Sequence, residues 1–266
     1  MKRTAEPLRD YLDFAIETAW QAGKLTLGYY QRPEIQAELK PDESPVTIAD
    51  RLAEEMIREQ ISRKYPDHAI VGEEYGAGET DDATHRWFID PIDGTRSFVR
   101  GIPLYAVLLG LEINGRCEVG VAYYPVLKEM LAAATGEGCR WNGRAAKVSP
   151  TTSLKQGILT HANAAAFHSL ERGPAFHRLQ NAAGYCAGWA DAYAYLLVAT
   201  GRAEVALDPI MSPWDCAPFP PILREAGGYF GDWSGKETIY AKEAMATTQA
   251  LLPEVLGLIK GEGTEE

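Results

Sequence analysis

The sequence lacks the features of exported, membrane-embedded and nucleic-acid-binding proteins. Its first twenty residues contain no short apolar core followed by a small-residue cleavage site, as a secretory signal would. No run approaches the roughly 18 uninterrupted apolar residues of a membrane-spanning helix. The formal net charge is −11, and Lys and Arg form no cluster of the kind that binds a phosphate backbone. We therefore expect a cytoplasmic protein with neither nucleic acid nor membrane as a partner.

Cysteine and histidine patterns that would indicate disulfides or zinc are also missing. The four cysteines are widely spaced and include no C-x-x-C pair, so we expect reduced and mostly buried thiols. The five histidines show no ligand spacing and are interpreted as structural or surface residues. The phosphate-binding G-x-x-x-x-G-K-[ST] loop and the G-x-S-x-G elbow are absent as well. These absences exclude P-loop nucleotide hydrolysis and the usual serine hydrolases.

The patterns that are present predict a mixed α+β and α/β protein. Its 266 residues, 46% of them hydrophobic, suffice for a sizeable core. Apolar residues at helical spacing predict one helix over residues 8–30 and a second that starts near Asp50. Short apolar runs predict strands at residues 69–71 and 87–89, followed by an antiparallel meander over residues 105–134.

The second half predicts a layered α/β unit. Strand-like segments at residues 157–160 and 204–207 alternate with helical patterns at residues 167–182 and 191–200 and from Asp215 onward. A turn-rich stretch places a boundary near residues 148–156, between an N-terminal α+β lobe (1–150) and a C-terminal α/β lobe (151–266). We expect the two lobes to pack tightly as one globule.

Residues 87–95, WFIDPIDGT, carry the strongest chemical signal. A buried strand leads to Asp90, Pro91 forces a turn, and Asp93 is placed to cap a helix that opens with the next two residues. Free amides at a helix start bind phosphate, and two carboxylates across a tight turn can converge on cations. The alternative from this segment alone is a strand-turn-helix corner in which both aspartates only cap, because capping is a common use of Asp.

Acidic residues recur where other predicted elements end or begin. Glu73 and Glu74 follow the strand at residues 69–71, and Asp215 starts a helix. This all-oxygen set suits Mg²⁺, with Mn²⁺ as the alternative, rather than Zn²⁺. Bound cations would also let so acidic a chain accept a phosphate. The spacing D-x-x-D-G-T differs by one residue from the D-x-D-G-T of haloacid-dehalogenase-like phosphatases, so Asp90 is interpreted as a metal ligand rather than a nucleophile.

Taken together, Glu73-Glu74, the segment from Asp90 to Thr95 and Trp214-Asp215 resemble the inositol monophosphatase-like superfamily. The resemblance extends through nearly the whole chain, including Val46-Thr47-Ile48-Ala49-Asp50 and Glu225-Ala226-Gly227-Gly228. It implies a layered αβαβα sandwich, a small phosphorylated metabolite as substrate and a homodimer. It also implies two Mg²⁺ ions per site, with a third and weaker one near Glu73.

The resemblance further implies a role for each matching residue. The implied metal ligands are Glu73, Asp90, the carbonyl group of Ile92, Asp93 and Asp215. Glu73 and Thr95 would position and deprotonate the attacking water, and Asp50 would hydrogen-bond the Thr95 hydroxyl. The amides of Gly94 and Thr95 would hold the phosphate, with Arg96 as a further candidate. The substrate-binding residues expected in all are Asp93, Gly94, Thr95, Arg96, Asp191 and Asp208.

Within the superfamily, residues 94–105, 189–195 and 207–218 look most like the histidinol-phosphate phosphatases. Histidinol phosphate carries an ammonium group and an imidazole, so a site for it should offer a carboxylate beyond the metal ligands. Asp191 and Asp208 are the candidates. Each has a simpler interpretation, because Asp191 could only cap the helix that follows and Asp208 could only start a turn.

Other functions stay open at this point. The enzymatic alternatives are phosphatases for inositol-1-phosphate, fructose-1,6-bisphosphate or adenosine-3′,5′-bisphosphate. The non-enzymatic alternative is a regulatory protein that binds a phospho-ligand without turnover. Loss of a ligand carboxylate would favour that alternative, and no carboxylate of the set is missing from the sequence.

Overall fold

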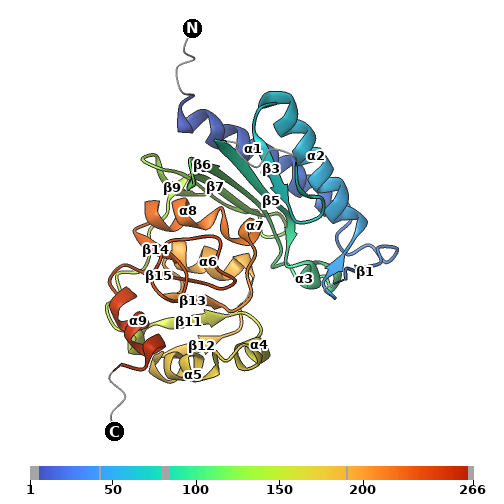
Figure 1. Cartoon of the computed structure of the whole chain (residues 1–266). Coiled ribbons are helices and arrows are strands. Elements are labelled where there is room, and N and C mark those ends of the chain that lie inside the picture. The colour runs from blue at the N-terminus through green and yellow to red at the C-terminus, as the bar shows by residue number, and fades with distance from the viewer. Residues whose placement is uncertain (1–5, 42, 79–83, 190, 263–266) are drawn as a thin grey trace.

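The chain folds into five alternating layers of helices and sheets (Figure 1), in a computed structural model that describes residues 6–41, 43–78, 84–189 and 191–262. Eight strands form the larger sheet, in the order β10-β9-β8-β7-β6-β5-β3-β4. Their bounds are β3 Ala69–Gly72, β4 Gly76–Ala77, β5 His85–Asp93, β6 Ala106–Ile113, β7 Arg116–Tyr124, β8 Glu129–Ala134, β9 Gly138–Trp141 and β10 Arg144–Ala145.

The smaller sheet has five strands in the order β12-β11-β13-β15-β14. Their bounds are β11 Ile158–His161, β12 Tyr185–Ala187, β13 Val205–Asp208, β14 Gly228–Gly231 and β15 Ala244–Thr248. A separate antiparallel pair joins β1 (Glu38–Leu39) to β2 (Pro45–Val46). The strands β11, β12 and β13 run parallel, whereas β15 pairs antiparallel with both β13 and β14.

Helices cover both sheets and fill the space between them. The outer layer on the large sheet is α1 (Leu8–Leu27) and α2 (Ile48–Lys64), and the middle layer contains α6 (Ala192–Ala199), α7 (Pro213–Cys216) and α8 (Phe219–Glu225). The layer beyond the small sheet contains α4 (Ala164–Ser169), α5 (Gly173–Ala182) and α9 (Leu252–Lys260). A short α3 (Thr95–Val99) follows β5, and a 3₁₀ turn spans Leu154–Gln156. The expected αβαβα sandwich is confirmed.

The layers follow from side-chain periodicity. On α1, Tyr11, Ala15, Ala19 and Ala22 recur at helical spacing and are buried against the large sheet. On β5 the side chains alternate, so that Trp87 and Ile89 face α1 and α2 while Phe88 faces the middle layer. The sheet is therefore buried on both faces, and only its ends and loops remain for a site.

Several predicted boundaries need correction. The expected helix over residues 167–182 is two helices, α4 and α5, because the chain turns at residues 170–172. The strand expected to end at Asp90 continues to Asp93, with an irregularity in its pairing to β6 between these two residues. Asp93 was expected to cap the next helix, but the N-cap position of α3 is Gly94, with a φ of 82°. A left-handed φ is easy for glycine and costly for most other residues.

In the part of the chain that the structure describes, no helix combines the length and the apolar character needed to cross a membrane. The division into lobes at residues 148–156 stays a prediction. Helix α8 packs on β7 and β8 of the large sheet and on β14 of the small one, so the two sheets share the middle layer.

Candidate active site

Two parallel strands deliver acids to a common edge of the large sheet. β3 and β5 pair in register from Ala69 opposite Arg86 to Gly72 opposite Ile89. Glu73 therefore follows β3 beside the point where Asp90 occurs on β5, and the amide of Glu73 donates to the carbonyl oxygen of Ile89 at 3.1 Å. The ends of the two strands are therefore neighbours, and the acids that follow them share one edge of the sheet.

Three aspartates from two elements converge at this edge. One carboxylate oxygen from each of Asp90, Asp93 and Asp215 lies within 4.8 Å of the other two. Asp215 comes from the first turn of α7, where it forms a capping box by accepting from the Ser212 amide at 2.8 Å. Hereafter Asp90, Asp93 and Asp215 are called the aspartate trio.

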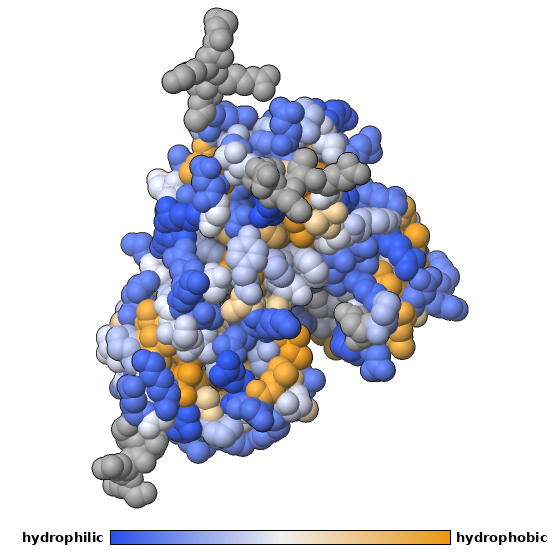
Figure 2. Space-filling model, viewed as in Figure 1, coloured by the Kyte–Doolittle hydropathy of each residue, from blue (hydrophilic) through white to orange (hydrophobic). Residues whose placement is uncertain are grey.

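The trio lines a cavity of about 160 Å³. Figure 2 shows, in the view of Figure 1, a mostly hydrophilic face that is hollowed between the region of α3 and the lower layers. The residues that line the cavity come from both halves of the chain: Glu73, Asp90, Ile92, Asp93, Gly94, Thr95, Asp191, Ala192, Tyr195, Asp208, Ile210, Met211, Asp215 and Phe219. Of the expected site residues, only Asp50 and Arg96 are not in this lining.

Burial makes the charged forms of these acids costly. It raises the pKa of Asp90 and of Asp93 well above the ordinary range, and the neighbouring carboxylates raise it further. The same cause raises the pKa of Asp215 to about 7, against the hydrogen bond from the Ser212 amide. Buried carboxylates this close together are stable as anions only if cations or hydrogen-bond donors compensate them. The trio therefore fits a cation, and its oxygen-only chemistry fits Mg²⁺.

Asp50 and Thr95 form a linked pair beside the cavity. The Thr95 hydroxyl lies 3.2 Å from Asp50 Oδ1 and 3.0 Å from the carbonyl oxygen of Ile92, and it can donate to either. Asp50 belongs to the capping box of α2, in which it accepts from the amide and the hydroxyl of Thr47 at 2.8 and 2.6 Å. Burial raises the pKa of Asp50 to about 6, although the bonds from Thr47 oppose the rise.

Asp93 also ties the site to the second half of the chain. Its Oδ2 accepts from the amide of Ala192, 99 residues away, at 2.7 Å. Asp93 thus bonds the first turn of α6 rather than that of α3. This bond, together with Asp215, fixes the middle layer to the end of β5.

Asp191 lies at the start of α6 without capping it. Its φ is 57°, and its side chain makes no capping hydrogen bond. A Cβ on Gly94 would lie 3.0 Å from Asp191 Oδ2, so the carboxylate rests against the Gly94 backbone. Burial raises the pKa of Asp191, while a hydrogen bond with Ser97 and the charge of Arg96 lower it. The simple capping interpretation therefore does not describe Asp191.

Asp208 both starts a turn and lines the cavity. It ends β13, accepts from the Ile210 amide at 2.9 Å in a turn, and also lines the cavity. Arg96 lies farther out, where its guanidinium donates to the carbonyl oxygen of Glu43 at 3.4 Å. It borders a separate surface hollow with Pro45 and Ile102.

Two residues beside Glu73 were missed by the sequence analysis. Lys40 donates to Glu73 Oε1 at 2.8 Å and to Glu74 Oε1 at 2.7 Å. The fully buried Glu54 accepts from the amides of Glu74 and Tyr75 at 2.8 and 3.3 Å. Lys40 offsets the charge of the acidic pair and Glu54 holds the turn that presents it. In the sequence, Glu54 stood out only as an acid at helical spacing from the apolar residues Ile57 and Ile61. Nothing in the sequence pointed to Lys40.

Asp208 leads to a prediction for stability. Burial raises its pKa to about 8, so the folded state keeps a proton that the unfolded state releases. The free energy of unfolding should therefore fall as pH rises from about 4 to about 8. Asp208→Asn removes this loss, and we expect it to stabilise the metal-free protein at pH 8 by at least about 1 kcal/mol more than at pH 5. Urea unfolding in a chelator measures the difference; an equal effect at both pH values would contradict it.

Comparisons with known proteins identify the family of the chain. The pattern of the inositol monophosphatase family matches residues 8–260. The chain is similar to a histidinol-phosphatase from Chlorobaculum parvum, with 43% identity over 89% of this chain and 91% of that protein. It is also similar to the Nus factor SuhB of Pasteurella multocida, with 34% identity over 94% of this chain and 95% of that protein. An inositol monophosphatase structure from Anabaena superposes with a TM-score of 0.84 at 30% identity, over 96% of both chains. The chain is therefore a phosphatase of the inositol monophosphatase family.

Proposed function

We propose that the protein hydrolyses a small phosphate monoester, with Mg²⁺ held by Glu73, Asp90, the carbonyl oxygen of Ile92, Asp93 and Asp215. The observation that carries the proposal is the convergence of the aspartate trio in one cavity with Glu73 and Thr95. Mg²⁺ bound there would lower the pKa of water and offset the charge of the phosphate. No covalent phosphoenzyme is needed, because a water activated by the bound cation can attack phosphorus directly.

The residues around the trio would orient and deprotonate the attacking water. When the Thr95 hydroxyl donates to Asp50, its lone pairs are free to accept from a water in the cavity. Glu73 borders the same space and is a second acceptor for that water. The water oxygen would form the new bond to phosphorus while the ester P–O bond breaks, and the leaving alcohol takes up a proton.

The backbone after β5 would hold the phosphate. Gly94 has a left-handed φ, and successive amides in such a turn, those of Gly94 and Thr95, can together hold a phosphate oxygen. Asp93 would contact the substrate on the same side. Arg96 is oriented by the backbone of Glu43, so we assign it the smaller role of lowering negative charge around Asp191.

We further propose L-histidinol phosphate as the substrate, which would place the enzyme in histidine biosynthesis. Support comes from two acids, Asp191 and Asp208, that border the cavity in addition to the trio, because a bound ammonium group would favour their ionised forms and pair with them. A relative named histidinol-phosphatase at 43% identity supports the same choice. Inositol-1-phosphate is the competing substrate, because the Anabaena structure is named an inositol monophosphatase.

A side-by-side assay tests the substrate. We expect kcat/KM for L-histidinol phosphate to exceed that for inositol-1-phosphate by at least about tenfold, the scale of a modest pocket interaction. Asp191→Asn should remove most of this preference by lowering kcat/KM for histidinol phosphate alone. Asn has the shape of Asp and, like Asp, is among the side chains most often found at positive φ, so the variant should fold. The reverse substrate order in the unmodified enzyme would disprove the histidinol assignment and leave the hydrolytic mechanism intact.

A regulatory role without turnover is the second candidate, favoured by the Nus factor name of one relative. The complete acidic set argues for catalysis, because a binding protein has no need for every ligand carboxylate.

The homodimer and the cytoplasmic location stay predictions. Sedimentation of the purified protein would measure its mass in solution and so test the homodimer.

A further inference from the structure

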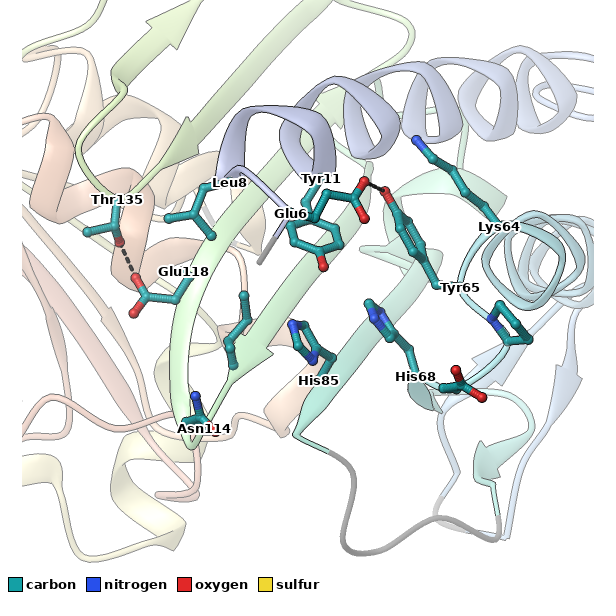
Figure 3. Close-up of a pocket in the computed structure, with 13 residues that line it drawn as sticks. Glu6, Leu8, Tyr11, Lys64, Tyr65, His68, His85, Asn114, Glu118 and Thr135 are labelled. Atoms are coloured by element: carbon teal, nitrogen blue, oxygen red, sulfur yellow. Dashed lines mark hydrogen bonds between the residues drawn. The ribbon is translucent and has the colours of Figure 1, made fainter. Parts of the chain in front are cut away.

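A second and larger cavity, of about 770 Å³, opens at the opposite end of β5 from the aspartate trio (Figure 3). It is called the histidine pocket here, after His68 and His85. Its lining comes from the start of α1, the turn between α2 and β3, and the ends of the strands around β5: Glu6, Leu8, Tyr11, Lys64, Tyr65, Pro66, Asp67, His68, His85, Ile113, Asn114, Glu118 and Thr135.

The histidine pocket is separate from the active site. His85 is the first residue of β5 and Asp90 the sixth, so their α-carbons lie about 17 Å apart at the rise of an extended strand. The two sets of lining residues share no member. The proposed hydrolysis therefore leaves the groups in this pocket unused.

Three near-parallel rings form one wall of the pocket. Tyr65 and His68 stack at 4.8 Å between ring centroids and 6° between planes, and His68 and His85 stack at 4.4 Å and 12°. The Tyr11 ring packs obliquely on all three, at 5.1 to 5.8 Å. In Figure 3 these rings lie together between α1 and the sheet. A planar ligand can extend such a stack.

Burial disfavours the charged form of both imidazoles in this wall. The indole N–H of Trp87 donates to His68 Nδ1 at 3.0 Å, which fixes the proton of His68 on Nε2. Burial lowers the pKa of His68 to about 4, helped by the nearby His85, and burial lowers that of His85 as well. The wall therefore offers π faces and N–H groups but no positive charge.

The charges around the rings are mostly negative. Glu6, Asp67 and Glu118 contribute carboxylates, and Glu6 Oε1 accepts from the Tyr65 hydroxyl at 3.1 Å. Glu118 accepts from the Thr135 hydroxyl on the other side of the pocket (Figure 3), and its Oε1 also lies 3.5 Å from the guanidinium of Arg116 in an exposed ion pair. Among the described residues that line the pocket, Lys64 is the one cation. Its ammonium lies over the rings of Phe14 and Tyr65, at 4.9 and 5.2 Å from their centroids.

We propose that the histidine pocket binds a small planar heteroaromatic cation. Its ring would extend the stack on the outer face of His85, because both faces of His68 are covered by Tyr65 and His85. Its ammonium group would face the carboxylate of Glu6 or that of Glu118, which lie on different sides of the pocket (Figure 3). Aromatic faces and carboxylates both attract cations, and a cavity of this volume holds a small organic molecule. Anions of the same shape are disfavoured by the carboxylates.

Titration calorimetry with two matched probes tests the proposal. Histamine carries an imidazole ring and an ammonium group, and 3-(imidazol-4-yl)propanoate carries the same ring with a carboxylate. We expect histamine to bind at least about tenfold more tightly than the propanoate. Mg²⁺ and inorganic phosphate, added in excess to occupy the active site, should leave histamine binding unchanged. Equal binding of both probes, no binding of histamine, or competition by Mg²⁺ and phosphate would each overturn the proposal.

Variants and spectroscopy locate the bound probe. The double variant Glu6→Gln, Glu118→Gln removes two carboxylates that line the pocket and keeps the size of both side chains. It should weaken histamine binding at least about fivefold. Glu171→Gln, an exposed change outside the pocket, is the matched control. In the unmodified protein, histamine should shift the NMR signals of the His68 and His85 ring protons. Unshifted ring signals, or equal weakening by the control, would place the probe elsewhere and overturn the proposal.

Discussion

Asp93→Asn should lower kcat by at least about a thousandfold while the protein stays folded. The substitution removes one of the three converging carboxylates, so the cation site loses a charge and a preferred ligand at the reacting centre. The side-chain oxygen of Asn can still accept from the Ala192 amide, which keeps α6 attached to β5. Because the carboxylate is buried beside other acids, its loss relieves repulsion in the metal-free state.

Two measurements accompany this variant. Thermal unfolding in a chelator should give a Tm equal to or above that of the unmodified protein, whereas Mg²⁺ should raise the Tm of the variant less than that of the unmodified protein. Asp10→Asn, an exposed acid on α1, is the matched control and should change neither property. A folded Asp93→Asn protein with near-normal kcat would contradict the role of Asp93 as a metal ligand.

Thr95→Val should lower kcat by about a hundredfold or more, within the range of general acid–base catalysis. Valine keeps the shape of the side chain but removes the hydroxyl that links Asp50 to the cavity. Asp50 keeps its two bonds from Thr47, so α2 should stay capped and the stability should change little. Steady-state kinetics should show the loss in kcat rather than in KM.

Thr95→Ser separates the hydroxyl from the methyl group. Serine retains the donor and acceptor, so this variant should recover most of the activity that valine loses. Equal losses in the serine and valine variants would mean that Thr95 acts through packing and would remove the Asp50–Thr95 pair from the mechanism.

The sequence predicted the elements that carry a regular pattern and the acids at their ends. The sequence located Glu73 and Asp90 at the ends of two strands, and only the structure shows that these strands are parallel neighbours that end at one edge. The hydrogen-bonded pair of Asp50 and Thr95 was expected from the family resemblance, since nothing local joins residues 45 positions apart. Local patterns locate secondary structure well, and a resemblance adds the long-range contacts.

What was missed depends on tertiary contacts. Asp93 was expected to cap the helix next to it, but its carboxylate reaches the amide of Ala192 in the other half of the chain. Glu54 and Lys40 belong to a helix and a turn whose sequences show no link to Glu73. β15 and α9 were not predicted, because the apolar segments after Tyr229 are short and separated by turns.

The most direct test of the central claim is phosphate release from L-histidinol phosphate by the purified, chelator-treated protein with and without Mg²⁺. We expect no release above background in the chelator and full recovery on addition of Mg²⁺, whereas Asp93→Asn should show little release in either condition. Release at the same rate without any divalent cation would contradict the account, because hydrolysis would then not depend on a cation bound by the aspartate trio.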